Sequence, residues 1–527
     1  MNLRPMPPET SMAPGPAPGP SGAGEKWAQR PRHRFRRLLL LTAMVLVALS
    51  SGMFLMPRPP ALSSATTGDA ALAAQVRAAA GDVRGYRGIA VALIEGDRVR
   101  FAGLGGSGNP EHPGVDRSTV FEAGSLGKPM TGMLLAELAS RKSLDLDVPL
   151  QELLPDMSFR DRALGSAPLR DLASHRAGLD LMPANLDTFL RGAGLRTLGR
   201  DPYRGMTQED VFTAGRNAVA SGAGRFRYSN LGMALAGQTA ARVLDKPYEQ
   251  LLQEHVLTPL DMRGTRMVHS DATAPPNSAT GYKSNGVVME HWLASGYTPA
   301  GDVWSTSEDL ARLLQAQLSG TAPGADAAVP RFDAGRAGEI GLGWYTTRTQ
   351  GREITWHDGV SGGFTSYMGF DRSGHKGVVV LSNTNRPVQA IGTRLLGLTA
   401  DAGHPAPDAT RTALTVLCSA GAAGPVLYVA RRRFPKRIHW AHLGISTVFG
   451  LALLILVRRT GDWLSVPPIA WALGIAGLSA GIVLGIRRGP SPDNDRDQQA
   501  GEGAVLPAAR YAGALLLLLL LVIAAEL

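Results

Sequence analysis

The stretch FEAGSLGKPMTG, residues 121–132, places a serine and a lysine three positions apart where a helix is predicted to begin. Positions i and i+3 lie about 60° apart around a helix axis, so Ser125 and Lys128 share one face. A serine hydroxyl becomes an effective nucleophile when a neighbouring group takes its proton, and a lysine held neutral by burial can do so. The spacing therefore predicts a nucleophile and a base, although two ordinary polar residues at a helix start show the same pattern.

Two further polar motifs follow in chain order. The tripeptide YSN at 228–230 lies on a predicted turn before a helix, and HDG at 357–359 lies near the end of a predicted strand. A phenol has a pKa near 10 in water, so Tyr228 can act as a base near neutral pH only if positive charge stabilises its anion. Lys128 would supply that charge. If Lys128 is neutral and Tyr228 protonated, Lys128 is the base instead, and the sequence leaves both assignments open.

In this order the three motifs resemble those of the serine β-lactamase and penicillin-binding-protein superfamily, and the tyrosine and histidine versions resemble its class C branch. Further segments in the family order are LRDLASHRAGL at 169–179, YSNLGMALAGQTAARVL from 228 and PAGDVWSTSEDLARLL at 299–314. The likeness covers nearly all of residues 85–400. It implies an α+β fold of the β-lactamase/transpeptidase type, in which helices flank an antiparallel sheet and form an all-α subdomain.

The resemblance also implies roles for single residues. Ser125 would be the nucleophile, and Lys128 together with Tyr228 would relay the serine proton to the leaving group. Asn230 would hold the substrate amide and Lys128, and His357 would make a polar contact across the cleft. This chemistry requires no metal and no cofactor, and we expect none.

Gly359 and Val360 provide the remaining substrate contacts of the predicted site. The resemblance implies that the backbone N–H groups of Val360 and Ser125 form an oxyanion hole. No Lys or Arg occurs within 360–363, and an acid, Asp358, occupies the middle of the third motif. A site without a nearby cation binds a substrate carboxylate less well. This pattern lowers the expectation for penicillins and D-Ala-D-Ala termini but keeps them as alternatives.

The elements that must position these residues are predicted from hydrophobic periodicity. GIAVALIEGDRVRFAGLG, from Gly88, is typical of two alternating strands around a turn at 95–97. Helical spacing of apolar residues follows Gly127, with Pro129 tolerated in the first turn. We expect one mixed domain over 67–404. Its later elements are predicted as strands at 353–359, 364–371 and 376–383 and a closing helix at 388–401.

Apolar runs flank this domain on both sides. Leu38–Met56 has 19 residues without a charge, and as a helix it would reach about 28 Å, close to the thickness of a bilayer core. We expect an uncleaved transmembrane anchor over 38–56, with a cleaved signal peptide as the alternative. The layout resembles that of the membrane-anchored, prodrug-activating D-amino peptidases. Four runs predict a bundle of transmembrane helices over 412–526: 412–430, 440–457, 464–486 and 511–525.

The net charge of +10 is concentrated in three segments. The Pro- and Gly-rich tail 1–37, expected to be disordered, the loop 431–438 and the loop 487–510 account for all of it, which is the positive-inside pattern. We therefore expect these segments in a bacterial cytoplasm and the mixed domain outside, with membrane lipid and no nucleic acid as a partner. Arg458 and Arg459 then lie on the outer side, against the trend.

The expected function is that of a membrane-anchored, extracytoplasmic serine hydrolase. Its substrate would be a small molecule or peptide, cleaved at an amide bond through an acyl-enzyme. A D-amino-acid-containing peptide or an exported precursor fits the expected location best. A β-lactamase, a D-alanyl carboxypeptidase and an esterase of the same family are alternatives. Another is a sensor that stays acylated and signals through the C-terminal helices to a membrane-protein partner, and an inactive scaffold ranks last.

Overall fold

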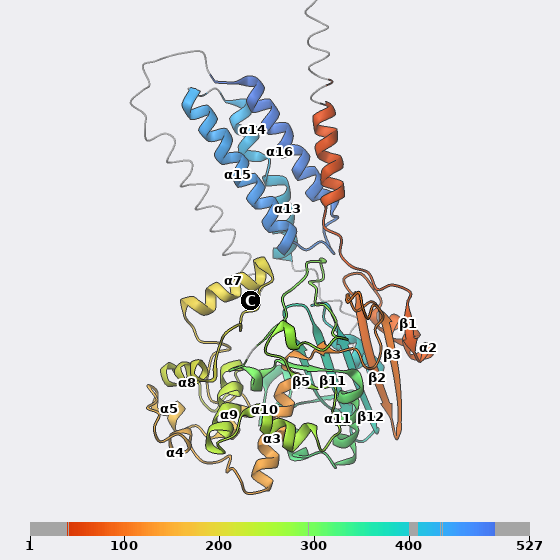
Figure 1. Cartoon of the computed structure of the whole chain (residues 1–527), viewed down its shortest axis with the longest axis vertical. Coiled ribbons are helices and arrows are strands. Elements are labelled where there is room, and N and C mark those ends of the chain that lie inside the picture. Colours follow the sequence, from red (N-terminus) through yellow and green to blue (C-terminus); the bar gives the residue numbers. More distant parts are fainter. Residues whose placement is uncertain are drawn as a thin grey trace, which may run out of the picture.

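The computed structural model describes residues 39, 42–293, 295–399, 409–432, 434 and 436–490. A group of long apolar helices stands on a larger domain of strands and helices (Figure 1). The expected tail 1–37 and the expected fourth C-terminal span 511–525 lie outside the described residues.

A nine-stranded antiparallel sheet organises the larger domain (Figure 1). The hairpin predicted from Gly88 is present, with its turn at Gly96, where φ is 61° and a residue without a Cβ is favoured. The three strands predicted near the C-terminal end of the domain pair in sequence, β10 with β11 and β11 with β12. In spatial order the strands are β1 (Thr66–Gly68), β3 (Arg98–Gly105), β2 (Gly88–Glu95), β12 (Lys376–Ser382), β11 (Thr365–Asp371), β10 (Arg352–Val360), β9 (Tyr345–Thr349), β8 (Glu339–Ile340) and β7 (Phe332–Asp333).

Both faces of the sheet are covered, which explains why strand β2 is apolar throughout. Ile89, Val91 and Leu93 point into a core beneath α2 (Ala70–Ala80) and α12 (Gln389–Leu395). The alternate residues of β2 point into the main core on the other side, beneath α11 (Ser307–Ser319). Because successive side chains of a strand point to opposite faces, one run of apolar residues serves two cores.

Helices that follow Ser125 in the chain form the all-α part of the domain, as expected. Its central helix α9 packs against α3, α6 and α8. A small sheet of β4 (Phe121–Glu122), β6 (Val303–Ser305) and β5 (Arg266–Met267) lies beside it. The helices are α3 (Gly127–Ser140), α4 (Leu150–Leu153), α5 (Arg162–Gly165), α6 (Leu169–Ala173), α7 (Leu186–Leu198), α8 (Gln208–Asn217), α9 (Asn230–Val243) and α10 (Tyr248–Leu252).

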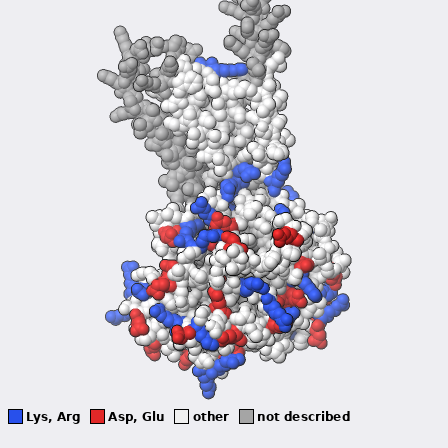
Figure 2. All heavy atoms as spheres, in the orientation of Figure 1, with Lys and Arg blue, Asp and Glu red and all other residues white. Residues whose placement is uncertain are grey.

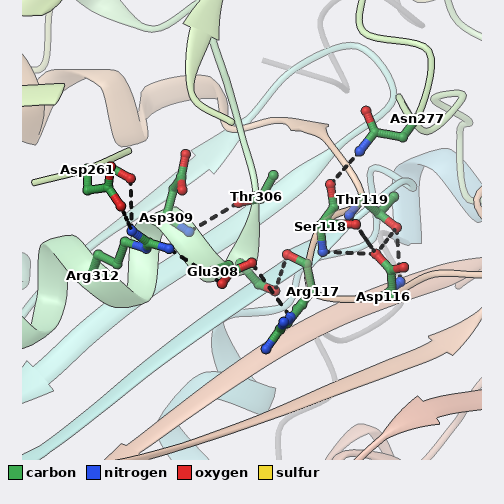
Figure 3. A network of polar contacts seen from close by, with 11 residues as sticks. Asp116, Arg117, Ser118, Thr119, Asp261, Asn277, Thr306, Glu308, Asp309 and Arg312 are labelled. Atoms are coloured by element: carbon green, nitrogen blue, oxygen red, sulfur yellow. Dashed lines mark hydrogen bonds and ion pairs between the residues drawn. The ribbon is translucent and has the colours of Figure 1, made fainter. Parts of the chain in front are cut away.

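A polar network holds the start of α11 against the rest of the domain (Figure 3). Thr306 caps the helix by accepting a hydrogen bond from the backbone N–H of Asp309 at 3.1 Å. Arg312, one turn later, forms ion pairs with Asp261 and Glu308. The ion pair between Arg312 and Asp261 therefore ties α11 to the loop that contains Asp261.

The C-terminal apolar helices are α13 (Ala409–Gly421), α14 (Gly424–Arg431), α15 (Lys436–Thr460) and α16 (Ile469–Arg488). Three segments are long and apolar enough to cross a membrane: Ala409–Arg431, Ile438–Thr460 and Ile469–Arg488. The visible face of this bundle carries almost no charged side chains (Figure 2). These helices therefore support membrane association of the chain.

One boundary of the apolar runs differs from the expectation, and the N-terminal run is described only in part. The run predicted at 464–486 begins its helix only at Ile469, after the N-cap residue Pro468. A proline disfavours the helical conformation in the residue before it, so the helix does not extend to the residues that precede Pro468. The described part of the N-terminal run forms the apolar helix Thr42–Leu55, which is shorter than a membrane span. The N-terminal anchor over 38–56 thus remains a prediction.

Candidate active site

Ser125 lies in a short 3-10 turn, η1 (Gly124–Leu126), between strand β4 and helix α3. The turn passes close to the end of β10. A Cβ at Gly124 would lie 3.0 Å from the backbone nitrogen of Val360, and Gly124 has a φ of 54°. A glycine at position 124 therefore allows the turn that carries Ser125 to approach the end of strand β10 closely.

Lys128 is completely buried on the first turn of α3. Its Nζ donates to the Oγ of Ser125 at 2.9 Å and also to the carbonyl oxygen of Ala300. Burial lowers the pKa of Lys128 to about 7, and the nearby charge of Asp358 opposes this shift. A substantial fraction of the amine is thus neutral near pH 7, which a proton acceptor requires.

Tyr228 immediately precedes helix α9, whose N-cap is Ser229. The Tyr228 Oη donates to the Oγ of Ser125 at 2.9 Å, and the Nζ of Lys128 lies 4.8 Å from the centre of the phenol ring. Burial raises the pKa of Tyr228 well above its usual value, although the Ser125 hydrogen bond acts in the other direction. The resting phenol is therefore protonated, and groups predicted from two separate motifs meet at the Oγ of Ser125.

Asn230, the last residue of the second motif, lines the cavity beside Ser125. Its side-chain N–H group donates to the Oη of Tyr203 at 3.0 Å, while its Oδ1 is buried without a partner among the described residues. A buried unpaired acceptor is costly unless another molecule satisfies it. Asn230 can therefore accept a hydrogen bond from a bound substrate.

His357 lies on the same face of β10 as Gly359, which borders the serine. The side chain is 1% exposed and stacks on Tyr345, with ring centres 5.1 Å apart. The centre of the Tyr228 ring lies 6.4 Å from that of His357. Burial, and then the charge of Lys128, lower the pKa of His357 to about 3, so the ring is neutral. His357 is thus buried beside Tyr228 and is not part of the cavity lining, and its contact with substrate stays a prediction.

Gly359 and Val360 border the serine from the end of β10. A Cβ at Gly359 would lie 2.2 Å from the carbonyl oxygen of Ala123 and 3.1 Å from the backbone nitrogen of Ser125, so only glycine fits there. Val360 is 55% exposed and lines the cavity. The backbone groups of Ser125 and Val360 are thus close neighbours, as an oxyanion hole requires.

The cavity beside Ser125 has a volume of about 70 Å³ and a largely aromatic wall that sequence reasoning missed. Tyr203 packs on Trp292 and Tyr297, with ring centres 5.0 and 5.3 Å apart. Isolated aromatic residues in loops carry no sequence signal of a shared wall. The lining residues are Gly124, Ser125, Tyr203, Asn230, Trp292, Tyr297, Ala300, Gly301, Asp302 and Val360. Among the described residues that line this cavity there is no Lys and no Arg.

Glu122 has a structural environment that its sequence position did not indicate. An acid at this point could meet a substrate ammonium or favour a helix start, but Glu122 is 3% exposed. It accepts hydrogen bonds from the ring of His291 at 2.8 Å and the backbone N–H of Trp292 at 3.3 Å. Burial lowers the pKa of His291, but the hydrogen bond and the charge of Glu122 raise it by more. The pKa of His291 is therefore above its ordinary value. The pair holds the loop that brings Trp292 to the cavity.

Potential metal ligands do not gather at this site. Within the described ranges, His, Cys, Asp and Glu form no group of three or more that could hold a metal ion. The chemistry supported by the geometry is instead the transfer of a proton from a serine hydroxyl to a buried amine, beside a protonated phenol.

Comparison with known proteins gives consistent matches. The family described as "Beta-lactamase" matches residues 73–401. The D-alanyl-D-alanine-carboxypeptidase/endopeptidase AmpH of Escherichia coli K12 is 27% identical over 317 residues, covering 54% of this chain and 76% of that protein. A protein named "Beta-lactamase" from the same strain is 25% identical over 347 residues, covering 57% of this chain and 85% of that protein.

Solved structures show the same fold. A β-lactamase/D-alanine carboxypeptidase from Pseudomonas syringae aligns with a TM-score of 0.53 and 20% identity, covering 63% of this chain and all of that one. A class C β-lactamase from Rhodobacter sphaeroides aligns with a TM-score of 0.52 and 23% identity, covering 62% and 97% of the two chains. At these identities the likeness shows the architecture of the larger domain.

Proposed function

Because the chain belongs to the beta-lactamase family and is a serine hydrolase, we propose that it cleaves an amide or peptide bond through an acyl-enzyme on Ser125. One observation carries the proposal. The Oγ of Ser125 lies 2.9 Å from both the Nζ of Lys128 and the Oη of Tyr228. This geometry supplies a nucleophile, a group that takes its proton and a group that can return one.

In the acylation step, neutral Lys128 accepts the proton of Ser125 as the serine oxygen attacks the carbonyl carbon of the substrate. The lowered pKa of Lys128 and the raised pKa of Tyr228 support this assignment over a phenolate base. The carbonyl oxygen becomes an oxyanion, which the N–H groups of Ser125 and Val360 stabilise. The C–N bond then breaks, and Tyr228 passes its proton to the departing amine. Lys128 returns the proton taken from Ser125 to the oxygen of Tyr228.

Deacylation reverses the roles with water as the nucleophile. Water attacks the ester carbonyl of the acyl-enzyme and gives its proton to the Lys128–Tyr228 pair. The ester C–O bond breaks, the acid product leaves, and Ser125 regains its proton. The buried ring of His357 lies beside that of Tyr228, and in this scheme His357 acts as a positioning residue.

The proposed substrate is a peptide or exported precursor that contains a D-amino acid. A relative is named a carboxypeptidase/endopeptidase, and the described lining of the cavity has no cation to bind a carboxylate. Endopeptidase-type or N-acyl cleavage leaves the terminal carboxylate outside the cavity, so it fits this lining better than removal of a terminal D-alanine. The unpaired oxygen of Asn230 would accept the substrate amide N–H.

The proposed location is a bacterial cytoplasmic membrane, with the hydrolase domain over 67–404 outside. The three apolar C-terminal spans support it, as do Arg431 at the end of α14 and Arg487 and Arg488 at the end of α16. The further assignments are a cytoplasmic tail at 1–37, an anchor at 38–56 and a bundle over 412–526. A membrane-protein partner would contact that bundle.

The proposal is tested with the purified full-length protein in detergent. We expect hydrolysis of an acylated D-amino-acid peptide to fall by at least about a thousandfold in Ser125→Ala, because the nucleophile is lost. A peptide amidated at its C-terminus is expected to react at least as well as the free acid. Extracts of the Ser125→Ala strain and its parent, compared by mass spectrometry, would reveal the uncleaved natural substrate.

Three outcomes separate the alternatives. Undiminished hydrolysis by Ser125→Ala would refute the acyl-enzyme on this serine. A strong preference for the free carboxylate or for a β-lactam would replace the proposed substrate class by that of a carboxypeptidase or β-lactamase. A stable adduct in the intact mass of the wild-type protein, without turnover, would identify a sensor.

A further inference from the structure

A second cavity lies where the apolar helices meet the hydrolase domain. It has a volume of about 430 Å³ and is formed by the end of the helix Thr42–Leu55, the loop 285–288 and the end of α15. Three arginines line it: Arg58, Arg458 and Arg459. The last two are the residues that departed from the positive-inside pattern of the sequence.

The arginines of this cavity, which we call the arginine pocket, have spare hydrogen-bonding capacity. Arg58 donates to the carbonyl oxygen of Phe54 at 3.3 Å, and Arg458 donates to that of Leu55 at 3.1 Å. Arg459 donates to the carbonyl oxygens at 197 and 198, both at 2.6 Å. A guanidinium carries five N–H donors, so most of them remain after these contacts.

No described acid forms an ion pair with any of the three arginines, whereas most arginines on the hydrolase domain have one. Three like charges around one cavity repel one another, and an anion between them removes that cost. Arginine also matches phosphate better than other side chains do, because its planar fork can form two parallel hydrogen bonds. The charge pattern thus specifies an anionic ligand, and phosphate suits it best.

The position of the pocket selects the source of the phosphate. The candidate span Ile438–Thr460 ends at the pocket, and Phe54, which is 75% exposed, and Met56 contribute an apolar side to it. Basic side chains lie between the uncharged bundle and the hydrolase domain, at the level where lipid headgroups would lie (Figure 2). A phospholipid would place its phosphate among the arginines and its acyl chains along the apolar helices.

We propose that the arginine pocket binds the headgroup of an anionic glycerophospholipid from the outer leaflet. This inference rests on the membrane location proposed above and not on the catalytic assignment. Helix capping alone accounts for single hydrogen bonds from Arg58 and Arg458 to the end of the helix Thr42–Leu55, but not for a cavity with three unpaired charges.

Lipid in this pocket would also steady a loop of the hydrolase domain. Asn285 in the pocket donates to the carbonyl oxygen of Arg459 at 3.0 Å. The chain continues from this loop through Met289 to Trp292, which lines the catalytic cavity. The bound headgroup would therefore fix the orientation of the hydrolase domain against the membrane and support one side of the cavity.

The test uses the full-length protein and phosphatidylglycerol, with phosphatidylcholine as the zwitterionic comparison. Native mass spectrometry from detergent would measure lipid retained by wild type, Arg458→Gln, Arg58→Gln and the double variant. Each lost charge is expected to weaken phosphatidylglycerol binding about fivefold and both together about 25-fold, while phosphatidylcholine binding changes less. Arg458→Lys keeps the charge and is expected to retain most of the binding.

The control is Arg98→Gln, which removes the same charge from an exposed position at the far end of β2 and β3. It is expected to bind phosphatidylglycerol like wild type. Hydrolysis of a soluble peptide by each variant checks that the catalytic domain has folded. Equal lipid retention by all variants, or none by wild type, would overturn the proposal. Inorganic phosphate is the remaining comparison. If millimolar phosphate displaces the lipid, and if phosphate without lipid binds as tightly as phosphatidylglycerol does, the pocket is a site for free phosphate instead.

Discussion

The identity of the base depends on how deeply two side chains are buried. Lys128 is completely buried and Tyr228 is partly buried, and burial disfavours the charged form of each. For the amine this favours the form that accepts a proton, and for the phenol it favours the form that donates one. The same physical effect therefore gives the two groups complementary roles around Ser125.

The pH dependence of the reaction follows from the pKa of Lys128. The amine is active when neutral, so kcat/KM is expected to rise with pH through about 7 and to level off above it. A pH profile of the purified enzyme with a neutral substrate measures this limb. Tyr228→Phe is expected to lower kcat by about 10²–10⁴-fold and to keep a limb near pH 7. Loss of that limb in Tyr228→Phe would show that the phenol, not the amine, titrates.

At the scale of elements, the site depends on the close approach of strand β10 to the turn η1. The approach occurs at Gly359, where the backbone of the strand meets the carbonyl of Ala123 and the amide of Ser125. The side chain of Ser366 on β11 also donates to Ala123 at 2.7 Å. Two elements more than 200 residues apart in sequence are thus held in contact at the predicted oxyanion hole.

Gly359→Ala tests this contact. The added methyl group would lie 2.2 Å from the Ala123 oxygen, so the strand and the turn must separate. A displacement of about 1 Å can cost about a hundredfold in rate, and we expect a loss of that size in kcat/KM. The matched control is Gly114→Ala, where a Cβ meets no atom within 4 Å. Full activity of Gly359→Ala would show that the approach is not needed.

At the scale of the whole molecule, the direction of each apolar helix determines which of the connecting segments lie on the same side of the membrane. The hydrolase domain follows the helix Thr42–Leu55 and precedes α13, and the end of α15 returns to the domain through Arg459. The end of α14 and the start of α15 therefore lie at the opposite end of the bundle, as in Figure 1. Arg431 at the end of α14 and Arg488 at the end of α16 lie at that opposite end, which agrees with a cytoplasmic location.

Cysteine labelling tests this topology. In a Cys418→Ala background, a cysteine at Asp97 is expected to react with a membrane-impermeant maleimide in intact spheroplasts, because the position is exposed on the hydrolase domain. A cysteine at Arg432 is expected to react only after permeabilisation. The wild-type protein, whose one cysteine Cys418 is 3% exposed within α13, serves as the unreactive control. The reverse labelling pattern would place the hydrolase domain in the cytoplasm.

The sequence by itself determined the features that depend on neighbouring residues. The i, i+3 spacing of Ser125 and Lys128 follows from helix geometry, and the strands and hairpin follow from alternation and turn residues. The order of the motifs was sufficient to predict the fold class. Apolar length predicted the C-terminal helices, except that the last described one begins after Pro468, five residues later than the apolar run from residue 464.

Only the tertiary structure decided what depends on residues far apart in the chain. It assembled the aromatic wall from Tyr203, Trp292 and Tyr297, buried His357 beside Tyr228 and brought Arg58 to Arg458 and Arg459. The physical reason is that burial and long-range contact are properties of packing. A pKa near 7 for a lysine requires surrounding atoms to exclude water, and those atoms come from several elements that no local pattern links.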